Sequence, residues 1–442
     1  MASRAPCRLR AKVTPRCRGR RVLGSFAYEG GTLCAGAVPL APLAERYGTP
    51  LYVYDFDAIA ARYGAFSAAL GDQPHRICYA VKANSNLALL ARLARLGSGF
   101  DIVSGGELAR VLAAGGDPAK IVFSGVGKST VELKAALDAN IGCFNVESEP
   151  ELWRLAALAE AAGVEAPVSL RVNPDVDPKT HPYISTGLKD NKFGLAVDQA
   201  AALYPRLAAH PGLRPVGIDF HIGSQLTTLE PFIDALRRVL ALVDQLEAEG
   251  ITLSHIDVGG GLGVRYDDEA PPSAAAYAAG LKGALQGRPQ TLVLEPGRWL
   301  VAEAGALLTT VEYEKHHEGK RFLIVDAAMT ELLRPALYDA WHPIVPLAEP
   351  ATDAKGAPAD VVGPVCESSD VLGRDRPLAV GEGDGLAILG AGAYGFGMAS
   401  NYNTRNRPAE VLLEAGQAHL VRRRERYEDQ FALESLALPG GE

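Results

Sequence analysis

The strongest constraint on the fold of this chain is a unit that repeats between about residues 75 and 298. In each repeat a short apolar run ends in polar or glycine residues, and an amphipathic stretch follows. Short apolar runs bounded by turn residues indicate buried strands, and apolar residues at helical spacing indicate helices packed on one face. The eight apolar runs span residues 77–82, 100–104, 120–124, 143–147, 168–173, 216–222, 255–259 and 291–295.

The stretches between these runs have the apolar spacing of helices, as at residues 86–96, 106–114, 129–139, 149–162, 230–249 and 273–286. Eight β-then-α units in roughly 220 residues predict an α/β fold, a (β/α)8 barrel. An open, doubly wound parallel sheet would show the same alternation and is the alternative on pattern alone. The barrel is favoured because the unusual residues fall at the C-terminal ends of the runs, the face where barrels build active sites. These residues are Lys82, Asn173, His221, the glycines 259–261 and Glu295.

The chain outside this repeat has a strand pattern. Segments 307–313, 321–326, 361–366, 386–391 and 418–421 resemble strands separated by turn residues, as do two runs within residues 22–56. We therefore predict a second, β-rich domain formed by the C-terminal third plus the N-terminal segment, with a helix near 327–340 or 395–405. The predicted division is a disordered basic tail (1–21), N-terminal strands (22–56), the barrel (57–300) and the C-terminal β-rich domain (301–442).

Charge and cysteine content exclude several function classes. The net charge is −8, and residues 1–21 carry eight basic residues and no acidic one, so the remainder has a net charge of −16. So acidic a body is a poor nucleic-acid binder, and no apolar stretch is suited to crossing a membrane as a helix. Six cysteines without a CxxC pair indicate reduced thiols and a cytoplasmic location. The basic tail is compatible with an organelle transit peptide, a nucleic-acid arm or an extension without function.

Lys82 closes an apolar run in the sequence YAVKAN, residues 79–84. A buried ammonium must be paired or neutralised, so a lysine at this place is either a rim residue that reaches solvent or a functional amine. The functional interpretation is a desolvated amine that forms a Schiff base with an aldehyde cofactor.

Three further motifs support the functional interpretation. The run DVGGGLG, residues 257–263, offers consecutive backbone amides suited to a phosphate, although a glycine cluster alone is most often a tight turn. EPGR, residues 295–298, adds a carboxylate and an arginine, and HIGSQ, residues 221–225, adds an imidazole and a hydroxyl. Together with the lysine at one barrel face, these groups indicate a site for pyridoxal 5'-phosphate.

These motifs also carry a family resemblance. YAVKAN, FDIVSGGEL, RVNP, KFG, GIDFHIGSQ, DVGGGLG, EPGR, GPVCESSD and the region of Tyr394 occur in order from about residue 24 to the C-terminus. In this the chain resembles the fold-type III pyridoxal-phosphate-dependent decarboxylases of basic amino acids. Within that group it looks most like the branch that converts meso-2,6-diaminopimelate to L-lysine and carbon dioxide in the last step of lysine biosynthesis.

The resemblance implies roles around the cofactor. Lys82 would bind its aldehyde, His221 would stack on its ring, and Glu295 would pair with its ring nitrogen. A protonated ring is the electron sink that decarboxylation needs, and alanine racemases, which share the barrel, place an arginine at that nitrogen instead. The implied cofactor-binding set is Lys82, His221, Ser224, Gly259, Gly260, Gly261, Glu295, Pro296, Gly297, Arg298 and Tyr394.

The resemblance also implies a substrate site shared between two subunits of a homodimer. Cys366 would return a proton to the substrate bound by the partner subunit, and Glu367 would bind the distal ammonium. The distal carboxylate of diaminopimelate needs cationic partners, because burying it alone would cost several kcal/mol. The implied catalytic residues are Lys82, His221 and Cys366, and the substrate-binding residues are Arg298, Arg334, Tyr338, Glu367 and Tyr394; no metal is expected.

Other interpretations remain open on sequence grounds. Without the surrounding motifs, Cys366 would be interpreted as a buried structural thiol and Arg334 as a surface cation. A decarboxylase of ornithine, arginine or carboxynorspermidine is the nearest alternative, although those relatives generally carry aspartate where this chain has Glu367. A catalytically silent cofactor-binding regulatory protein is another. The family more often has glycine at Ser369, which lies outside the implied catalytic set.

Overall fold

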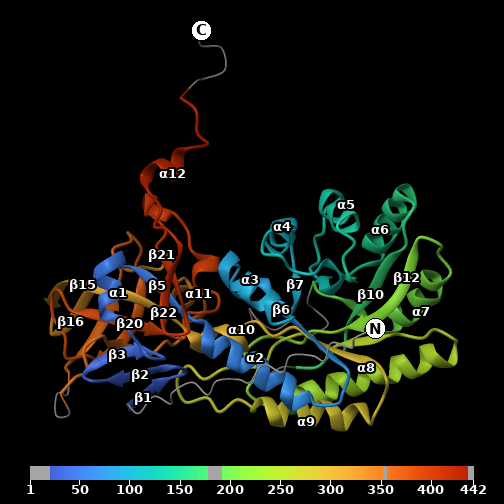
Figure 1. Cartoon of the computed structure of the whole chain (residues 1–442), viewed down its shortest axis with the longest axis horizontal. Helices are drawn as coiled ribbons and strands as arrows, with labels where there is room; N and C mark the ends of the chain where they lie inside the picture. The colour runs from blue at the N-terminus through green and yellow to red at the C-terminus, as the bar shows by residue number, and fades with distance from the viewer. Residues whose placement is uncertain (1–19, 178–191, 352–355, 437–442) are drawn as a thin grey trace, which may run out of the picture.

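The computed structural model describes residues 20–177, 192–351 and 356–436, which form two bodies side by side (Figure 1). One body is a barrel surrounded by helices, and the other is built of β-sheets. Strands from both ends of the chain lie together in the second body (Figure 1).

Eight parallel strands form the barrel in the order β6-β7-β8-β9-β10-β12-β13-β14. Two pairings close the ring, β9 with β10 and β14 with β6, so the predicted barrel is confirmed and the open sheet is excluded. The strands are β6 (His75–Ala80), β7 (Gly99–Ile102), β8 (Ile121–Phe123), β9 (Cys143–Val146), β10 (Ala166–Asn173), β12 (Leu213–Asp219), β13 (His255–Asp257) and β14 (Thr291–Leu294). The two-residue strand β11 (Leu195–Ala196) pairs with the end of β10.

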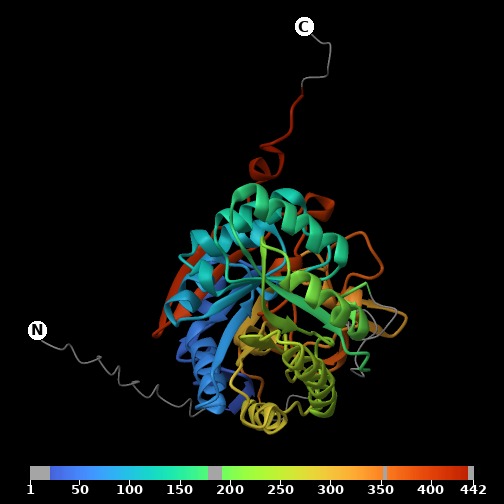
Figure 2. The same ribbon diagram turned by 90° about the vertical axis from the view of Figure 1, so that its right-hand side faces the viewer.

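Helices surround these strands (Figure 2). Several begin at a serine that satisfies a free backbone amide of the first turn: Ser104, Ser129 and Ser148 each accept from the amide three residues later. The helices are α2 (Phe56–Leu70), α3 (Leu87–Arg95), α4 (Gly105–Ala113), α5 (Thr130–Asp138), α6 (Glu149–Ala162), α7 (Val197–Ala208), α8 (Glu230–Ala248), α9 (Ala274–Leu285) and α10 (Arg298–Val301).

The last barrel unit differs from the simple repeat. Strand β14 is followed only by the four-residue helix α10, and α2, which precedes the first strand, packs against α9 and α10 instead. The eighth full-length helix of the ring therefore comes from before β6.

The second body confirms that the N-terminal segment joins the C-terminal third. Strand β5 (Leu51–Asp55) pairs antiparallel with β15 and parallel with β21 in one sheet. The strands after the barrel are β15 (Gly305–His317), β16 (Lys320–Val325), β17 (Ile344–Pro346), β18 (Pro358–Val362), β19 (Val371–Pro377), β20 (Gly385–Leu389), β21 (Ala409–Glu414) and β22 (Gln417–Arg422). Before the barrel come β1 (Arg20–Leu23), β2 (Phe26–Glu29), β3 (Thr32–Ala35), β4 (Val38–Pro39) and α1 (Ala41–Tyr47).

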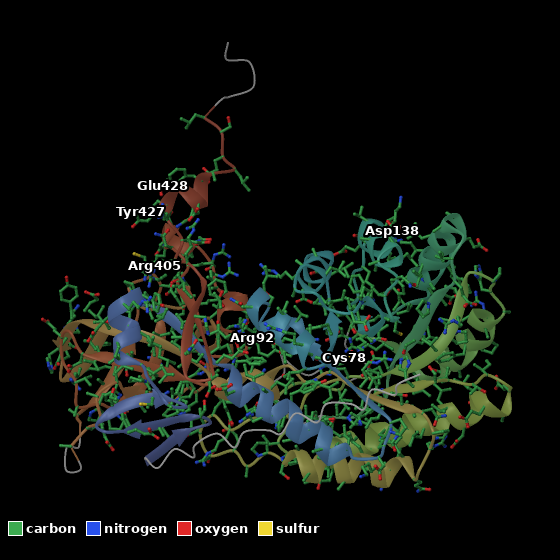
Figure 3. The ribbon with its side chains drawn as sticks, viewed as in Figure 1. Cys78, Arg92, Asp138, Arg405, Tyr427 and Glu428 are labelled. Atoms are coloured by element: carbon green, nitrogen blue, oxygen red, sulfur yellow. The ribbon has the colours of Figure 1, made fainter. Side chains whose placement is uncertain are left out.

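Strand β5 links the two bodies because both of its faces are buried. Its side chains alternate, so Leu51 and Val53 pack into the core of the β-rich body, whereas Tyr52 and Tyr54 belong to the core that runs through the barrel. Both tyrosine hydroxyls are hydrogen-bonded. On the outside, Arg92 of α3 (Figure 3) donates to Glu414 of β21 at 2.7 Å and adds a second connection.

Some predicted elements differ in the structure. The helix expected near 327–340 is the short α11 (Arg334–Tyr338), and region 395–405 contains 3-10 turns. The strand expected at 361–366 ends at Val362, so Cys366 lies in a turn. Residues 1–19 of the predicted tail lie outside the described residues, and β1 begins at Arg20; the boundaries at 57 and 301 stay predictions.

Two general properties of the described chain bear on function. In the part of the chain that the structure describes, no helix is long and apolar enough to cross a membrane. Cys34, Cys78, Cys143 and Cys366 are free thiols, and the buried Cys78 belongs to the first barrel strand (Figure 3).

Candidate active site

Lys82 lies in a short 3-10 turn, Val81–Ala83, that follows the first barrel strand. Its ammonium donates to Asp101 at 2.8 Å, and Asp101 stands on the neighbouring strand β7, fully buried. Burial lowers the pKa of Lys82, but the carboxylates of Asp101 and Glu295 outweigh burial, so the net pKa is raised. With 37% of its side chain accessible, Lys82 is a held but reachable amine rather than a surface lysine.

Three carboxyl groups lie beside this lysine inside the barrel. Asp219 ends β12, Asp257 ends β13 and Glu295 follows β14, and their carboxyl oxygens lie within 4.8 Å of one another. All three are buried. Burial and mutual repulsion raise the pKa of each, to about 7 for Asp257 and well above the usual range for Asp219 and Glu295. Such a cluster is suited to a cation, although no metal was expected from the sequence.

Arg171 is the second cation of the barrel interior. It donates to Glu147 at 2.9 Å, and its Nε lies 3.8 Å from a carboxyl oxygen of Asp219. Glu147 also accepts the amides of Gly125 and Gly194. The hydrogen bond from the Gly194 amide to Glu147 therefore holds the KFG segment, residues 192–194, against the barrel.

The glycine loop and His221 are joined by a hydrogen bond. The amide of Gly260 donates to Nδ1 of His221 at 3.2 Å, so the proton of the neutral ring lies on Nε2. Burial, followed by the charges of Arg171 and Lys82, lowers the pKa of His221 well below its usual value. His221 is therefore a neutral ring near neutral pH, suited to stacking more than to ion pairing.

Backbone packing explains why the loop consists of glycines. A Cβ on Gly260 would lie 2.3 Å from the carbonyl oxygen of Glu295, and one on Gly261 would lie 2.4 Å from that of Gly223. Gly259 has a φ of 64°, and a Cβ there would meet the His221 ring at 2.8 Å. Gly297 packs against two alanines, one of them Ala83 beside Lys82. The loop thus brings bare backbone close to Glu295 and His221.

Two buried arginines contact Tyr266. Arg298 donates to the Tyr266 hydroxyl at 2.8 Å and to Ser224 at 3.0 Å. Arg334, at the start of α11, lies 4.5 Å from the centre of the Tyr266 ring and contacts His342 at 2.8 Å. Among the described residues, no carboxylate forms a salt bridge with either arginine. Two buried cations without a carboxylate partner make a site for an anion.

Tyr394 connects this arginine pair to Lys82. Its amide donates to the carbonyl oxygen of Ala83 at 2.8 Å, and Arg298 lies 4.7 Å from the centre of its ring. Its backbone has a φ of 55°, an unusual conformation for a residue with a side chain. Tyr338, on α11, is near enough to influence the pKa of both arginines. Pro296 accepts from the amide of Ala80, which holds EPGR against β6.

Cys366 and Glu367 are placed differently from the other predicted residues. Both are exposed, and their described hydrogen bonds go to neighbours outside the barrel: Cys366 N donates to Asn403 at 3.1 Å, and Tyr402 donates to Glu367 at 2.7 Å. The interpretation of Cys366 as a buried thiol and of Arg334 as a surface cation is therefore wrong, because Cys366 is exposed and Arg334 is buried.

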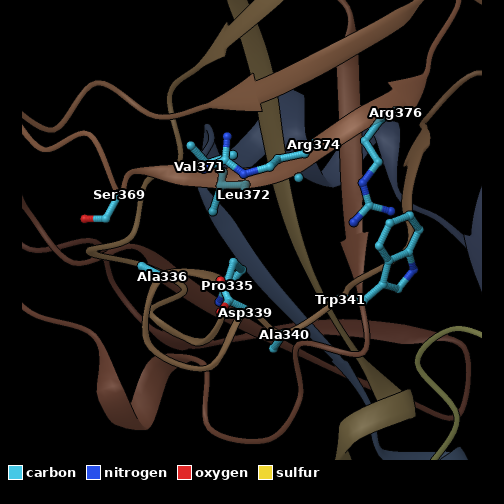
Figure 4. Close-up of a pocket in the computed structure, with 11 residues that line it drawn as sticks. Pro335, Ala336, Asp339, Ala340, Trp341, Ser369, Val371, Leu372, Arg374 and Arg376 are labelled. Carbon is cyan, nitrogen blue, oxygen red and sulfur yellow. The ribbon is translucent and has the colours of Figure 1, made fainter.

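A separate cavity of about 280 Å³ lies between α11 and β19 (Figure 4). Arg376 stacks on the indole of Trp341 at one end of it, and Ser369 lies at the other. Neither Arg334 nor Tyr338 lines this cavity, so it is distinct from the anion site.

Comparisons with known proteins identify similar proteins of one family. A model of the family "Pyridoxal-dependent decarboxylase, pyridoxal binding domain" matches residues 56–302. A diaminopimelate decarboxylase of Pseudomonas aeruginosa is 58% identical over 414 residues, which are 94% of this chain and 99% of the relative. One of Vibrio cholerae is 59% identical over 409 residues, 92% of this chain and 98% of the relative.

The chain belongs to the diaminopimelate decarboxylase family.

Solved structures support the same placement. Diaminopimelate decarboxylase from Helicobacter pylori, complexed with L-lysine, aligns with a TM-score of 0.86 and 47% identity over 89% of this chain and 98% of that one. The enzyme from M. jannaschii, also in complex with L-lysine, aligns with a TM-score of 0.89 and 39% identity. This alignment covers 94% of this chain and 99% of that one. A lysine/ornithine decarboxylase from Vibrio vulnificus at 24% identity and a TM-score of 0.74 shares the fold.

The residues of this diaminopimelate decarboxylase family member fit pyridoxal phosphate. Lys82 offers an amine for an aldehyde, the close-packed glycine loop offers backbone amides for a phosphate, and the carboxyl cluster around Glu295 has an excess of negative charge for a protonated ring nitrogen. These residues would thus provide partners for the aldehyde, the phosphate and the ring nitrogen of the cofactor.

Sequence reasoning missed several residues of this site. Asp101 lies in the quoted segment FDIVS, and an acid in an apolar run was a usable signal. Arg171, in SLRVN, carried the same signal for a cation. Tyr266 and His342 gave none, because both come from loops whose approach to Arg298 and Arg334 depends on the fold.

Proposed function

We propose that this chain removes carbon dioxide from meso-2,6-diaminopimelate to form L-lysine, using pyridoxal 5'-phosphate. The observation that carries this proposal is the pair of buried arginines, Arg298 and Arg334, which form no salt bridge with a carboxylate among the described residues. Arg298 also lies over the ring of Tyr394, whose amide bonds to Ala83, the neighbour of Lys82. A substrate with a distal carboxylate satisfies such a pair, whereas ornithine or arginine would leave a buried cation without its counter-charge.

The proposed cofactor contacts follow from the chemistry of each group. When bound, pyridoxal phosphate supplies an electron-withdrawing ring that accepts the electron pair left by the departing carboxylate. Lys82, held by Asp101, binds its aldehyde, and Glu295 accepts a hydrogen bond from its ring nitrogen. His221 presents the face of a neutral ring. Ser224, with the amides of Gly259, Gly260, Gly261 and Gly297, holds the phosphate.

The proposed substrate contacts centre on the arginine pair beside Tyr394. Arg334 and Arg298 bind the distal carboxylate, and Tyr338 adds a hydroxyl to the same group. Because Arg298 also contacts Ser224, it fixes the distance between the phosphate and the carboxylate subsites. That spacing selects substrates by length as well as by charge.

We propose that two chains complete each site. Cys366 and Glu367 are exposed on a turn that projects beside Tyr402, which is itself 48% exposed. A thiol and a carboxylate presented in this way can serve the site of a second copy, with Cys366 as the proton donor to the substrate and Glu367 as the partner of the distal ammonium. The remaining proposals are the division at residues 57 and 301 and a reducing cytoplasm as the compartment, which suits free thiols.

A substrate comparison tests this function. The purified protein, supplied with pyridoxal phosphate, should release carbon dioxide and L-lysine from meso-diaminopimelate. For ornithine and arginine, kcat/KM should be lower by more than about a hundredfold, because both leave the arginine pair unmatched. Equal rates on ornithine would refute the assigned substrate while leaving the decarboxylase chemistry in place.

A further inference from the structure

Asp257 belongs to the carboxyl cluster and also contacts the glycine loop. It is completely buried. Its Oδ1 accepts the amide of Gly259 at 2.9 Å, so one oxygen helps to shape the loop. Its Oδ2 has no hydrogen-bond partner among the residues that the structure describes, and Glu295 and Asp219 lie within 4.8 Å. The Asp257 carboxyl group therefore lies among other acids, and one of its oxygens is left without a donor in the described chain.

The charges around this oxygen do not balance. Four buried carboxyls, those of Asp101, Asp219, Asp257 and Glu295, share the barrel interior with two buried or half-buried cations, Lys82 and Arg171. Arg171 is also engaged by Glu147. Asp101 and Asp219 each have one further oxygen without a partner in the described chain. So many carboxylates cannot all be ionised in a buried site, and at least one must hold a proton.

We propose that Asp257 is a positioning residue for the ring nitrogen of the cofactor: Asp219, Asp257 and Glu295 share one proton when the cofactor is absent, and this proton leaves when the ring cation pairs with Glu295. The inference rests on the proposed function. The proton balance is simple, because a ring that arrives protonated brings one positive charge, and the displaced proton passes to the solvent. Asp257 keeps Glu295 protonated until that cation arrives.

The surrounding groups support this assignment. Burial first, then the neighbouring carboxylates, raises the pKa of Glu295 and of Asp219, and that of Asp257 to about 7, so the cluster holds its proton near neutral pH. The nearby thiols and the tyrosine have raised pKa values and stay neutral. The titratable and charged groups that face the cluster are Lys82, Asp101, Arg171, Glu147, His221, Cys78, Cys143 and Tyr277.

The test counts protons instead of turnover. Pyridoxal phosphate is titrated into the cofactor-free protein between pH 6.5 and 8.5 by calorimetry, in buffers of different ionisation heat. We expect the wild type to release about one proton more than Asp257→Asn, so that the pH dependence of cofactor affinity differs by up to about tenfold per pH unit. Asp55→Asn is the matched control, because burial also raises the pKa of Asp55, which caps α2 away from the cluster.

An arm without any substitution covers the case in which Asp257→Asn does not fold. An analogue with carbon in place of the ring nitrogen, 1-deazapyridoxal phosphate, can still bind Lys82 but brings no ring cation. Wild-type protein should then release about one proton fewer than with pyridoxal phosphate. Pretreatment with a chelator should change neither count, because the cluster holds a proton and not a metal ion.

The outcomes separate this inference from the proposed function. If pyridoxal phosphate does not bind at all, the proposed function fails. If it binds and the wild type, Asp257→Asn and the deaza analogue all give the same proton count, the proposed function stands and the role of Asp257 is refuted. A merely structural role for Asp257 in the glycine loop would weaken affinity equally at every pH.

Discussion

Arg334→Met should separate substrate binding from cofactor binding. Arg334 is 6% exposed, contacts His342 at 2.8 Å and lies over Tyr266, while its Nε has no partner among the described residues. Methionine keeps an unbranched side chain but removes the charge. Removing one partner of a buried ion pair costs about 3–5 kcal/mol. Because Arg298 remains as a second cation, we expect the lower end, a loss of roughly a hundredfold in kcat/KM.

The assay measures kcat/KM for meso-diaminopimelate together with the visible absorbance of the bound cofactor. The absorbance should not change, because the described contacts of Arg334 do not include Lys82, Glu295 or the glycine loop. Arg374→Met is the matched control: its side chain is 64% exposed and pairs with Asp360 at 3.5 Å on β18. An unchanged kcat/KM for Arg334→Met, or an equal loss in the control, would refute the proposed carboxylate site.

Three further predictions follow from the proposed assembly, the composition and the buried acids. Lys82→Ala and Cys366→Ala proteins should each be nearly inactive, but unfolded and refolded together they should recover about a quarter of wild-type activity, since half of the dimers are mixed and half of their sites are intact. Removing residues 1–19 should leave activity and thermal stability unchanged, because their basic composition cannot build an apolar core. Burial raises the pKa of Glu331 to about 7, so its contribution to stability is full below pH 4.5 and is lost as pH rises through 7. Glu331→Gln should therefore flatten the fall in melting temperature between pH 5 and 8.

Each of these has a clear contrary result. No recovery of activity in dimers that demonstrably exchange would place Cys366 in its own chain. A truncated protein with a lower melting temperature than the full-length chain would show that the tail contributes to the stability of the fold. A Glu331→Gln protein with the same pH dependence as the wild type would assign that dependence to other groups.

The barrel could be predicted from sequence because each strand and helix carries its own local pattern. The eight runs from residue 77 to 295 correspond to eight parallel strands, and serines such as Ser129 and Ser148 mark helix starts. Lys82, His221, Glu295 and the glycine loop could be found because polar or glycine residues at the ends of apolar runs are conspicuous. Their meeting at one barrel face follows from parallel strand order.

Other features depend on contacts distant in sequence. That α2 completes the helix ring could not be predicted, because only its packing against α9 shows it. Tyr266 comes from a loop, and its contacts with both Arg298 and Arg334 depend on where α11 meets the barrel. The shared acid cluster depends on strand order and register, since Asp219 and Asp257 are paired on neighbouring strands β12 and β13 and Glu295 follows the adjacent β14. The residues themselves were visible in the sequence, but the contacts between residues distant in sequence could not be predicted from it.

The most direct test of the central claim is a stoichiometry measurement. Protein loaded with pyridoxal phosphate is treated with borohydride to confirm a reducible bond at Lys82, and untreated protein is incubated with meso-diaminopimelate. We predict equimolar L-lysine and carbon dioxide from the wild type, and neither product from Lys82→Ala, because no other amine in the described site lies against Asp101. Substantial L-lysine formation by folded Lys82→Ala protein, or a reducible cofactor bond in the wild type without any product, would contradict the account.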